Sequence, residues 1–219
     1  MHVLWVTWIH ALPNFLLGLK VTLEITGLAL VLALVLGFVL ALGRLSGVRV
    51  FEFVAMVFVE VIRAIPVLVL LFVAYYSMGQ WGVKLSGFAA GTLTLGVFYA
   101  TQYGEIFRGG ILAVDRGQRE AAQALGLSST AIMGKIILPQ AFFNILPPAT
   151  NQLSNLIKDT SLVYTISVTD LMFQAYLAGS NSFQYMDDFL LAGVLYFAFY
   201  IILSKLLARW ELNVQRRRA

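Results

Sequence analysis

The chain has no cysteine and only two histidines, His2 and His10, both in its N-terminal segment. Without cysteine it can form no disulfide, no thiolate nucleophile and no cysteine-ligated metal site. Two histidines near one terminus also offer no cluster of ligands for a metal ion. We therefore expect neither metal chemistry nor cysteine-based catalysis in this protein.

Charged residues are scarce as well, at 12% of 219 residues, whereas 60% are apolar and the mean hydropathy is +0.84. A soluble domain of this length cannot bury so much apolar surface, so the composition predicts an integral membrane protein. Five stretches lack Asp, Glu, Lys and Arg and approach or exceed the roughly 17 residues that a spanning helix needs: 25–43, 64–83, 85–104, 136–157 and 189–204.

The predicted fold is all-α, with residues 1–219 forming a single transmembrane domain of about five helices. The last charge-free stretch is the shortest, but Lys205 and Arg209 can extend it because their apolar stems reach the interface. We predict no linker and no repeat. The spans are expected at roughly 18–43, 51–76, 85–107, 133–157 and 189–209.

Lysine and arginine are distributed unevenly between the predicted loops, and cytoplasmic loops carry the excess. The pattern predicts the N-terminus outside and the C-terminus in the cytoplasm, with Arg63 in or near the second span. Three basic residues then lie outside (Lys20, Lys84 and Lys158), and eleven lie inside: Arg44, Arg49, Arg108, Arg116, Arg119, Lys135, Lys205, Arg209, Arg216, Arg217 and Arg218. We interpret the basic tail as a topological anchor and not as a nucleic-acid-binding arm. The N-terminus lacks the features of a cleaved signal peptide.

A soluble-looking stretch, EAAQALGLSSTAIMGKIILP, runs from Glu120 to Pro139 between two predicted spans on the cytoplasmic side. Its first part has no proline and many helix formers, which predicts a helix at about 118–127. The alanines Ala121, Ala122 and Ala124 allow a partner to approach the backbone closely. The segment therefore has the properties of a docking helix.

Glycine and serine mark the end of this helix and the beginning of the next one. Gly126 can close the docking helix in a left-handed cap. Ser128 or Ser129 can serve as the N-cap of the following helix, which enters the membrane from Ile136 onward. The residues that we assign to coupling are Glu120, Ala121, Ala122 and Gly126.

A second site combines Glu60 and Arg63 on one helix face, shortly before Pro66. Charged groups within a span cost roughly 2.5–3.5 kcal/mol each near the bilayer centre, so such a pair is a functional-site hypothesis. Two interpretations remain open. The two residues form a mutual salt bridge beside a proline kink, or they recognise the ammonium and carboxylate groups of an amino acid.

The spacing of Glu120-Ala-Ala, Gly126, Ile136 and Leu138-Pro139 resembles the cytoplasmic coupling motif of the membrane subunits of ATP-binding-cassette importers. Three further segments resemble type I importer permeases for polar amino acids, and the resemblance extends from about residue 18 to residue 209. These segments are EIFRGGI at 105–111, GQR at 117–119 and LIKDTSL at 156–162.

The resemblance implies a type I permease fold, located in a bacterial cytoplasmic membrane, that forms a translocation path for an amino acid. It implies two ATP-binding-cassette ATPase subunits, a second permease protomer, identical or homologous, and an amino-acid binding protein as partners. The chain itself has no phosphate-binding loop, because Gly134-Lys135 continues into Ile136 and not into serine or threonine. ATP and Mg²⁺ are therefore expected in the ATPases, and no cofactor and no enzymatic activity are expected in this chain.

The residues that we consider for the substrate path share polar chemistry or a helix break within or beside the spans. They are Glu60, Arg63, Pro66, Lys158, Asp159, Thr160 and Ser161. Purely structural interpretations of these residues remain open as well. Lys158 and Asp159 can simply end the fourth helix, and Glu105 and Arg108 can form an ordinary interfacial pair.

The alternative function is a secondary transporter or channel that uses a Glu60/Arg63 ion pair. A membrane-embedded enzyme is a third class, but the sequence offers no convergent nucleophile and base.

Overall fold

The computed structural model describes the backbone of residues 2–216, and this range contains helices and turns but no strand. The predicted all-α class is confirmed. Arg217 and Arg218 of the basic tail lie outside the described residues. The long helices are α1 (His2–Arg44), α4 (Gly87–Leu112), α7 (Leu138–Asp159) and α9 (Tyr185–Arg216). Shorter elements connect them: α2 (Arg49–Ala64), α3 (Val67–Phe72), η1 (Val73–Ser77), η2 (Met78–Trp81), α5 (Arg116–Ala124), α6 (Ser129–Ile132), η3 (Met133–Ile137), η4 (Thr160–Ile166) and α8 (Leu171–Ser182).

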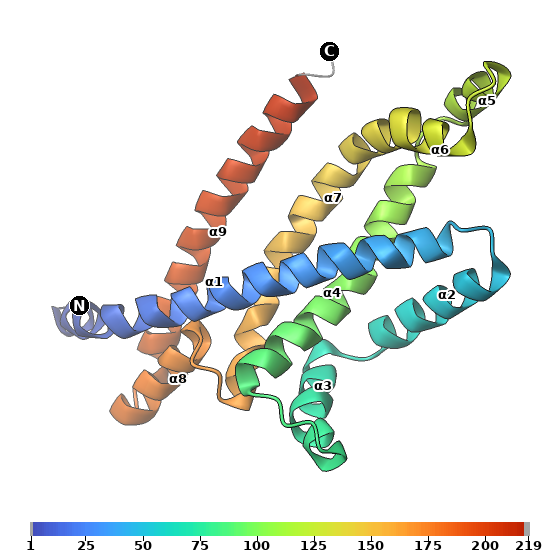
Figure 1. Ribbon diagram of the computed structural model, residues 1–219. Coiled ribbons are helices and arrows are strands. Elements are labelled where there is room, and N and C mark those ends of the chain that lie inside the picture. The colour runs from blue at the N-terminus through green and yellow to red at the C-terminus, as the bar shows by residue number, and fades with distance from the viewer. Residues whose placement is uncertain (1, 217–219) are drawn as a thin grey trace.

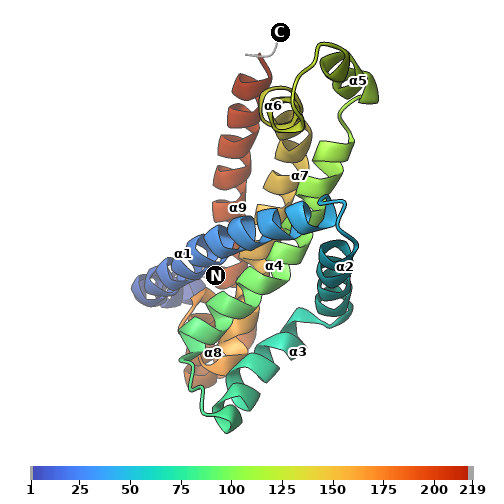
Figure 2. The ribbon, with the colours of Figure 1, turned by 45° about the vertical axis from the view of Figure 1, so that its right-hand side comes forward.

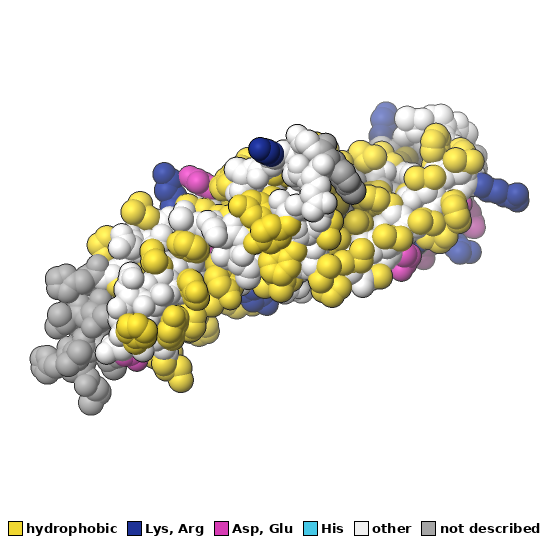
Figure 3. Space-filling model, turned by 90° about the horizontal axis from the view of Figure 1, so that it is seen from below, with side chains coloured by type: hydrophobic (Ala, Val, Ile, Leu, Met, Phe, Trp, Pro, Cys, Tyr) yellow, Lys and Arg dark blue, Asp and Glu magenta, His cyan; other side chains and the backbone are white. Residues whose placement is uncertain are grey.

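Three helical stretches within the described residues are long and apolar enough to cross a membrane: Ala11–Arg44, Ser129–Ile166 and Tyr185–Trp210. They coincide with the first, fourth and fifth predicted spans. The exterior agrees with this setting, because hydrophobic side chains cover much of the face shown in Figure 3 and charged side chains occur there in isolated groups. The protein is therefore built for a lipid environment.

The second predicted span, residues 51–76, is broken into two helices. Arg49–Ala64 and Val67–Gln80 meet at an angle of 99° and qualify as a fourth span only if they are counted together. The break follows from Pro66, because the residue before a proline is driven out of the helical region. Ile65 accordingly has the extended angles φ −96° and ψ 129°. The kink expected beside Glu60 and Arg63 is thus a full change of direction.

Helix α4 corresponds to the third predicted span, 85–107, and it differs from the others in composition. It has 26 residues, but threonine, tyrosine, glutamine and glycine make it too polar to qualify by hydropathy. The protein interior compensates for part of this polarity, since the buried Thr101 and Tyr103 donate hydrogen bonds to the carbonyls of Phe98 and Ala149. Helix α4 packs most extensively against α1 and next against α7. The count of five spans stays a prediction.

Glycines allow α1 and α4 to approach one another closely. A Cβ atom added at Gly37 would lie 2.9 Å from the carbonyl oxygen of Ala100 and 3.0 Å from the amide nitrogen of Gly104. Small residues at such crossings bring the two backbones into contact, which is a main source of helix association in membranes. The central apolar cluster continues along the same two helices with Ile25, Ala29, Leu95, Tyr99 and Tyr103.

The segments that the sequence assigns to opposite sides of the membrane lie at opposite ends of the molecule. Figure 1 and Figure 2 show α5, α6 and the C-terminal end of α9 together at one end, and α3 and α8 toward the other. This grouping places the docking segment at the same end of the molecule as the C-terminal end of α9, as the charge pattern requires. Which of the two ends faces the cytoplasm stays a prediction.

Candidate coupling and translocation sites

The docking helix predicted at 118–127 is present as α5, with different ends. It begins earlier, at Arg116, because the side chain of Asp115 caps it: Oδ1 accepts a hydrogen bond of 2.7 Å from the backbone N–H of Gly117. It ends at Ala124, because Gly126 adopts φ +75° and stops the helix. The left-handed conformation predicted for Gly126 is confirmed, whereas the C-terminal boundary was placed too late.

One side of α5 is buried against its own chain. Ala122 is 2% exposed and belongs to an apolar cluster formed by the end of α4, by α6 and by the start of α7. Ala122 therefore contacts its own chain, where its small side chain lets α5 lie flat on the cluster, and its assignment to coupling stays a prediction. The cluster is formed by Ile111, Val114, Ala122, Ile132, Ile137 and Ala141.

The other side of α5 is exposed and includes Glu120 and Ala121. Leu125, directly after the helix, is 81% exposed. Leu125 thus adds an apolar side chain to the exposed side of this segment. The exposed face of α5, with Glu120, Ala121 and Leu125, is therefore the candidate coupling surface.

The segment after α5 connects it to the long helix α7. The hydroxyl of Ser128 accepts a hydrogen bond of 3.3 Å from Ala131 N–H, so Ser128 is the predicted N-cap. A π-helical turn, η3, then joins α6 to α7, and Pro139 follows it in the first turn of α7. A proline is tolerated in a first helical turn because its missing N–H has no partner there.

Glu60 and Arg63 are both exposed, and neither takes part in a salt bridge among the described residues. The mutual salt bridge, one of the two interpretations of this pair, is therefore not formed. Arg63, in the last turn of α2 before the break at Ile65 and Pro66, instead borders a hollow of about 520 Å³ between α2, α4 and α7. The polar side chains that line it are Arg63, Gln102, Glu105, Asn144, Asn151 and Gln152.

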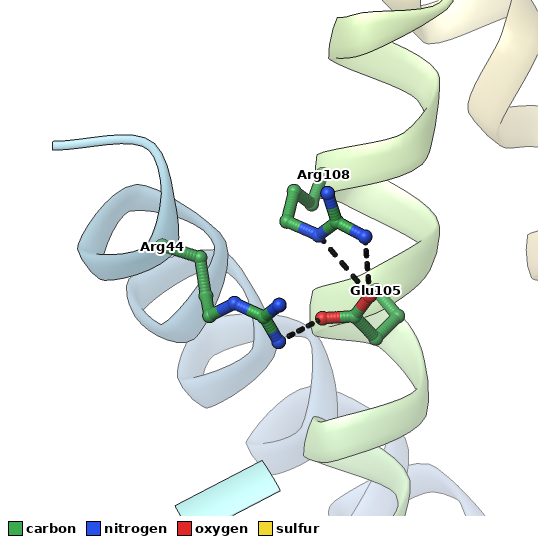
Figure 4. A network of polar contacts seen from close by, with 3 residues as sticks. All are labelled: Arg44, Glu105 and Arg108. Carbon is green, nitrogen blue, oxygen red and sulfur yellow. Dashed lines mark hydrogen bonds and ion pairs between the residues drawn. The ribbon is translucent and has the colours of Figure 1, made fainter. Parts of the chain in front are cut away.

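The predicted pair of Glu105 and Arg108 is confirmed, with N–H···O distances of 2.8 and 3.1 Å to Oε2. Sequence reasoning missed the third member, Arg44, whose Nη1 donates to the other carboxylate oxygen of Glu105 at 2.7 Å. Figure 4 shows the three side chains converging from α1 and α4. The available signal was that Arg44 and Glu105 end two predicted spans on the same side of the membrane.

The sequence 158–161 forms the end of α7 and the first turn of η4. Asp159 is the last residue of α7, and its Oδ2 accepts a hydrogen bond of 2.7 Å from the hydroxyl of Tyr99. Thr160 is fully buried and donates to the carbonyl of Ile157, whereas Lys158 is exposed. Ser161 donates to the Lys158 carbonyl.

The structure does not bring residues 158–161 together with Arg63. Pro148 lines the same hollow as Arg63, and ten residues of α7 separate Pro148 from Lys158, which is about 15 Å along a helix.

A buried carboxyl that sequence reasoning missed lies in the connection between η4 and α8. Asp170 is fully buried, and its Oδ1 accepts a hydrogen bond of 2.8 Å from Phe173 N–H as the N-cap of α8. Burial raises the pKa of Asp170 to about 7. The hydroxyl of Thr22, on α1, accepts from Leu171 N–H beside it. The hydroxyl of Tyr196, on α9, donates to Oδ2 of Asp170 at 3.5 Å. Asp170 therefore caps α8 and links it to α9, and the bond from Leu171 to Thr22 joins the start of α8 to α1.

No group of three or more potential metal ligands occurs among the residues that the structure describes. The sites that remain are the α5 surface and the polar hollow at Arg63. Both are regions where a membrane helix bundle exposes polar groups for a partner or a solute.

The comparisons with known proteins agree on one family. Residues 33–219 match the family described as "Binding-protein-dependent transport system inner membrane component". The arginine transport system permease protein ArtQ of Bacillus subtilis is 36% identical, over 90% of this chain and 90% of that protein. A probable amino-acid ABC transporter permease protein, y4tG, of Sinorhizobium fredii is 34% identical, over 95% of this chain and 90% of that protein.

Two solved structures have the same arrangement of helices. A chain from the crystal structure of an amino acid ABC transporter with histidines superposes with a TM-score of 0.91 and 34% identity, covering 95% of this chain and 97% of that one. A chain of the inward-facing MetNI methionine ABC transporter gives a TM-score of 0.70 at 19% identity, with 98% of each chain covered. At that identity the second match concerns the fold alone.

Proposed function

Because the chain belongs to the family of binding-protein-dependent transport system inner membrane components, we propose that it is the transmembrane subunit of an ATP-driven amino-acid importer. The observation that carries this proposal is α5, a capped helix whose Glu120 and Ala121 are exposed at one end of a membrane bundle. Relatives named for arginine and glutamine transport support amino acids as the substrate class.

The proposed assembly contains two ATPase subunits, a second permease protomer, identical or homologous, and an amino-acid binding protein. The ATPases bind ATP and Mg²⁺, since this chain has no phosphate-binding loop. They dock on α5 from the cytoplasm, and the binding protein docks at the opposite end of the bundle. The protein lies in the bacterial cytoplasmic membrane with the N-terminus outside and the C-terminus inside.

Motion of α5 reaches the membrane through two helices at once. The apolar cluster around Ala122 packs α5 against Ile111 of α4, and the same cluster contains Ile137, which leads directly into α7. A displaced α5 therefore moves α4 and α7 together. The ATPase drives this motion only if it binds α5 differently in its ATP-bound and ATP-free states.

The substrate path passes the polar hollow between α2, α4 and α7. Arg63 supplies a positive charge for the carboxylate of an amino acid, and the amides of Gln102, Asn151 and Gln152 offer donors and acceptors for its other polar groups. The second polar group, Lys158 to Ser161, belongs to a different level of the same path. Glu60 forms no salt bridge with Arg63, so the proposed carboxylate recognition is assigned to Arg63 alone.

The experiment is reconstitution of the permease with its ATPase and binding protein in vesicles, followed by uptake of labelled amino acids. Uptake that requires ATP supports the proposal, and Arg63→Gln should raise the substrate concentration for half-maximal uptake about tenfold. Arg49→Gln is the matched control, since Arg49 is an exposed arginine on the same helix, far from the hollow. Uptake driven by an ion gradient without the ATPase would favour a secondary transporter.

A further inference from the structure

The Arg44–Glu105–Arg108 cluster joins two helices that otherwise meet through apolar and small residues. Glu105 uses one carboxylate oxygen for Arg44 of α1 and the other for Arg108 of its own helix α4. The three side chains are 19%, 23% and 30% exposed for Arg44, Glu105 and Arg108. Charge-assisted bonds of 2.7–2.8 Å in a largely excluded site are strong and geometrically specific.

The two halves of the cluster have different structural consequences. Arg108 and Glu105 are i, i+3 neighbours, so their pair stays within α4. Arg44 is the last residue of α1, and its bond to Glu105 is the only salt bridge between different helices among the described residues. The Arg44–Glu105 bond therefore ties the end of α1 to α4, and the Arg108–Glu105 bond does not.

The same end of α1 also touches the coupling module. Leu45, directly after Arg44, packs against the apolar cluster of Ile111, Val114 and Ala122 beneath α5. On the other helix, Glu105 lies seven residues before the end of α4, which leads through Asp115 into α5. The Arg44–Glu105 ion pair and the apolar cluster thus both lie where α5 meets the ends of α1 and α4.

We propose that Arg44 and Glu105 form a clamp that carries the motion of α5 from α4 to α1, so that both helices move as one unit during the transport cycle. The clamp makes Arg44 and Glu105 positioning residues for transport. This inference rests on the proposed function, since it assigns a route for the motion that the ATPase starts at α5. Without the clamp, α1 still packs on α4 at the crossing near Gly37, but its last turn and the connection into α2 no longer follow α5.

Removal of different members of the cluster should have unequal effects. Arg44→Gln breaks the bond between α1 and α4 and leaves the Glu105–Arg108 pair intact. Glu105→Gln removes both bonds and leaves two partly buried guanidinium groups facing each other, which repel. Arg108→Gln keeps the bond between the helices.

The test measures amino acid imported per ATP hydrolysed in vesicles that contain the permease, the ATPase and the binding protein. Arg44→Gln and Glu105→Gln should lower this ratio about fivefold or more while ATP hydrolysis continues. Arg44→Lys should retain most of it, because the ammonium still pairs with Glu105. Lys20→Gln is the matched control, since Lys20 and Glu24 form an exposed ion pair on the same helix α1.

A second readout does not depend on amino-acid uptake. A cysteine introduced at the exposed Val48, in the turn between α1 and α2, is unique in this cysteine-free chain. In the complex with the ATPase, its labelling rate should change when a non-hydrolysable ATP analogue is added, and Arg44→Gln should abolish that change. If the wild-type complex imports no amino acid, the proposed function fails, but the labelling result still decides the clamp. A normal import ratio and labelling response in Arg44→Gln, or an equal loss in Arg108→Gln, would overturn it.

Discussion

Gly126 is the residue whose backbone angle decides how the coupling helix ends. Its φ of +75° lies in the left-handed region, and a Cβ atom added there would meet no heavy atom within 4 Å. The demand for glycine therefore comes from the backbone and not from lack of space. β-Branched residues are the least suited to this region.

Gly126→Val should strongly reduce transport while the protein still inserts into the membrane. The strained backbone angle costs about 1–3 kcal/mol, which α5 can avoid only by changing its ending and the position of Leu125. Gly27→Val is a suitable control, because Gly27 also has open space around it but no positive φ. ATP-driven uptake should fall in the first variant alone at equal membrane levels. Normal uptake by Gly126→Val would remove Gly126 from coupling.

Asp170 makes stability depend on pH. Burial raises its pKa to about 7, above the value of about 3.9 in an unfolded chain. Between these values the folded state binds more protons, so the contribution of Asp170 to the unfolding free energy is full below about pH 4 and is lost as the pH rises to about 7. The contribution of Asp170 to the Tm should fall by on the order of 5 °C between pH 5 and pH 8.

Asp170→Asn tests this assignment, because asparagine is also a good N-cap for α8 and carries no charge. The variant should fold and lose most of the pH dependence of its Tm in detergent. Asp115→Asn, at the exposed N-cap of α5, is the control and should leave the profile unchanged. If the wild-type and Asp170→Asn profiles run parallel, the titration of Asp170 does not govern stability.

At the scale of elements, α5 has one face for its own chain and one for a partner. Ala122→Leu should overpack the cluster beneath α5 and lower stability by about 1–3 kcal/mol. Ala121→Leu places the same bulk on the exposed face and should leave stability unchanged but weaken association with the ATPase. Thermal unfolding and copurification of the ATPase separate the two effects. Equal stability loss in both variants would show that the faces are wrongly assigned.

Helix α2 gives a second test at this scale, because Glu60 and Arg63 lie on it without pairing. Glu60→Gln should retain transport, whereas Arg63→Gln should impair it. The reversed pair, Glu60→Arg with Arg63→Glu, should stay defective, since a glutamate at the hollow repels a carboxylate. Recovery of uptake in the reversed pair would restore the salt bridge hypothesis and take Arg63 off the substrate path.

Much of this organisation could be predicted from local sequence, and what was missed depends on contacts between distant segments. Gly126 and Ser128 were identified because caps and turns depend on neighbouring residues. The burial of Ala122 depends on how α4 and α7 meet, and no local pattern reports it. Arg44 lies 61 residues from Glu105 in the sequence, so their bond required the packing of α1 on α4. The spacing of Glu60 and Arg63 is suited to a salt bridge. The hollow beside Arg63 is formed by α2, α4 and α7 together, so the sequence around Arg63 alone could not predict it.

At the scale of the whole molecule, the two ends of the bundle differ in their tasks. The docking surface on α5 and the C-terminal end of α9 share one end, and α8, which is capped by Asp170 and bonded to Thr22 through Leu171, lies toward the other. The positive-inside rule assigns the α5 end to the cytoplasm. Membrane topology therefore decides whether the ATPase can reach its docking surface at all.

Cysteines introduced singly at Ser128 and Asn181 test this topology in a chain that has no other cysteine. Both positions are exposed, one directly after α5 and the other near the end of α8. A membrane-impermeant thiol reagent should label Asn181→Cys in intact cells or spheroplasts and label Ser128→Cys only after the membrane is opened. Labelling of both from the same side would contradict the arrangement in Figure 1, and the reverse pattern would place α5 outside, where no cytoplasmic ATPase can dock.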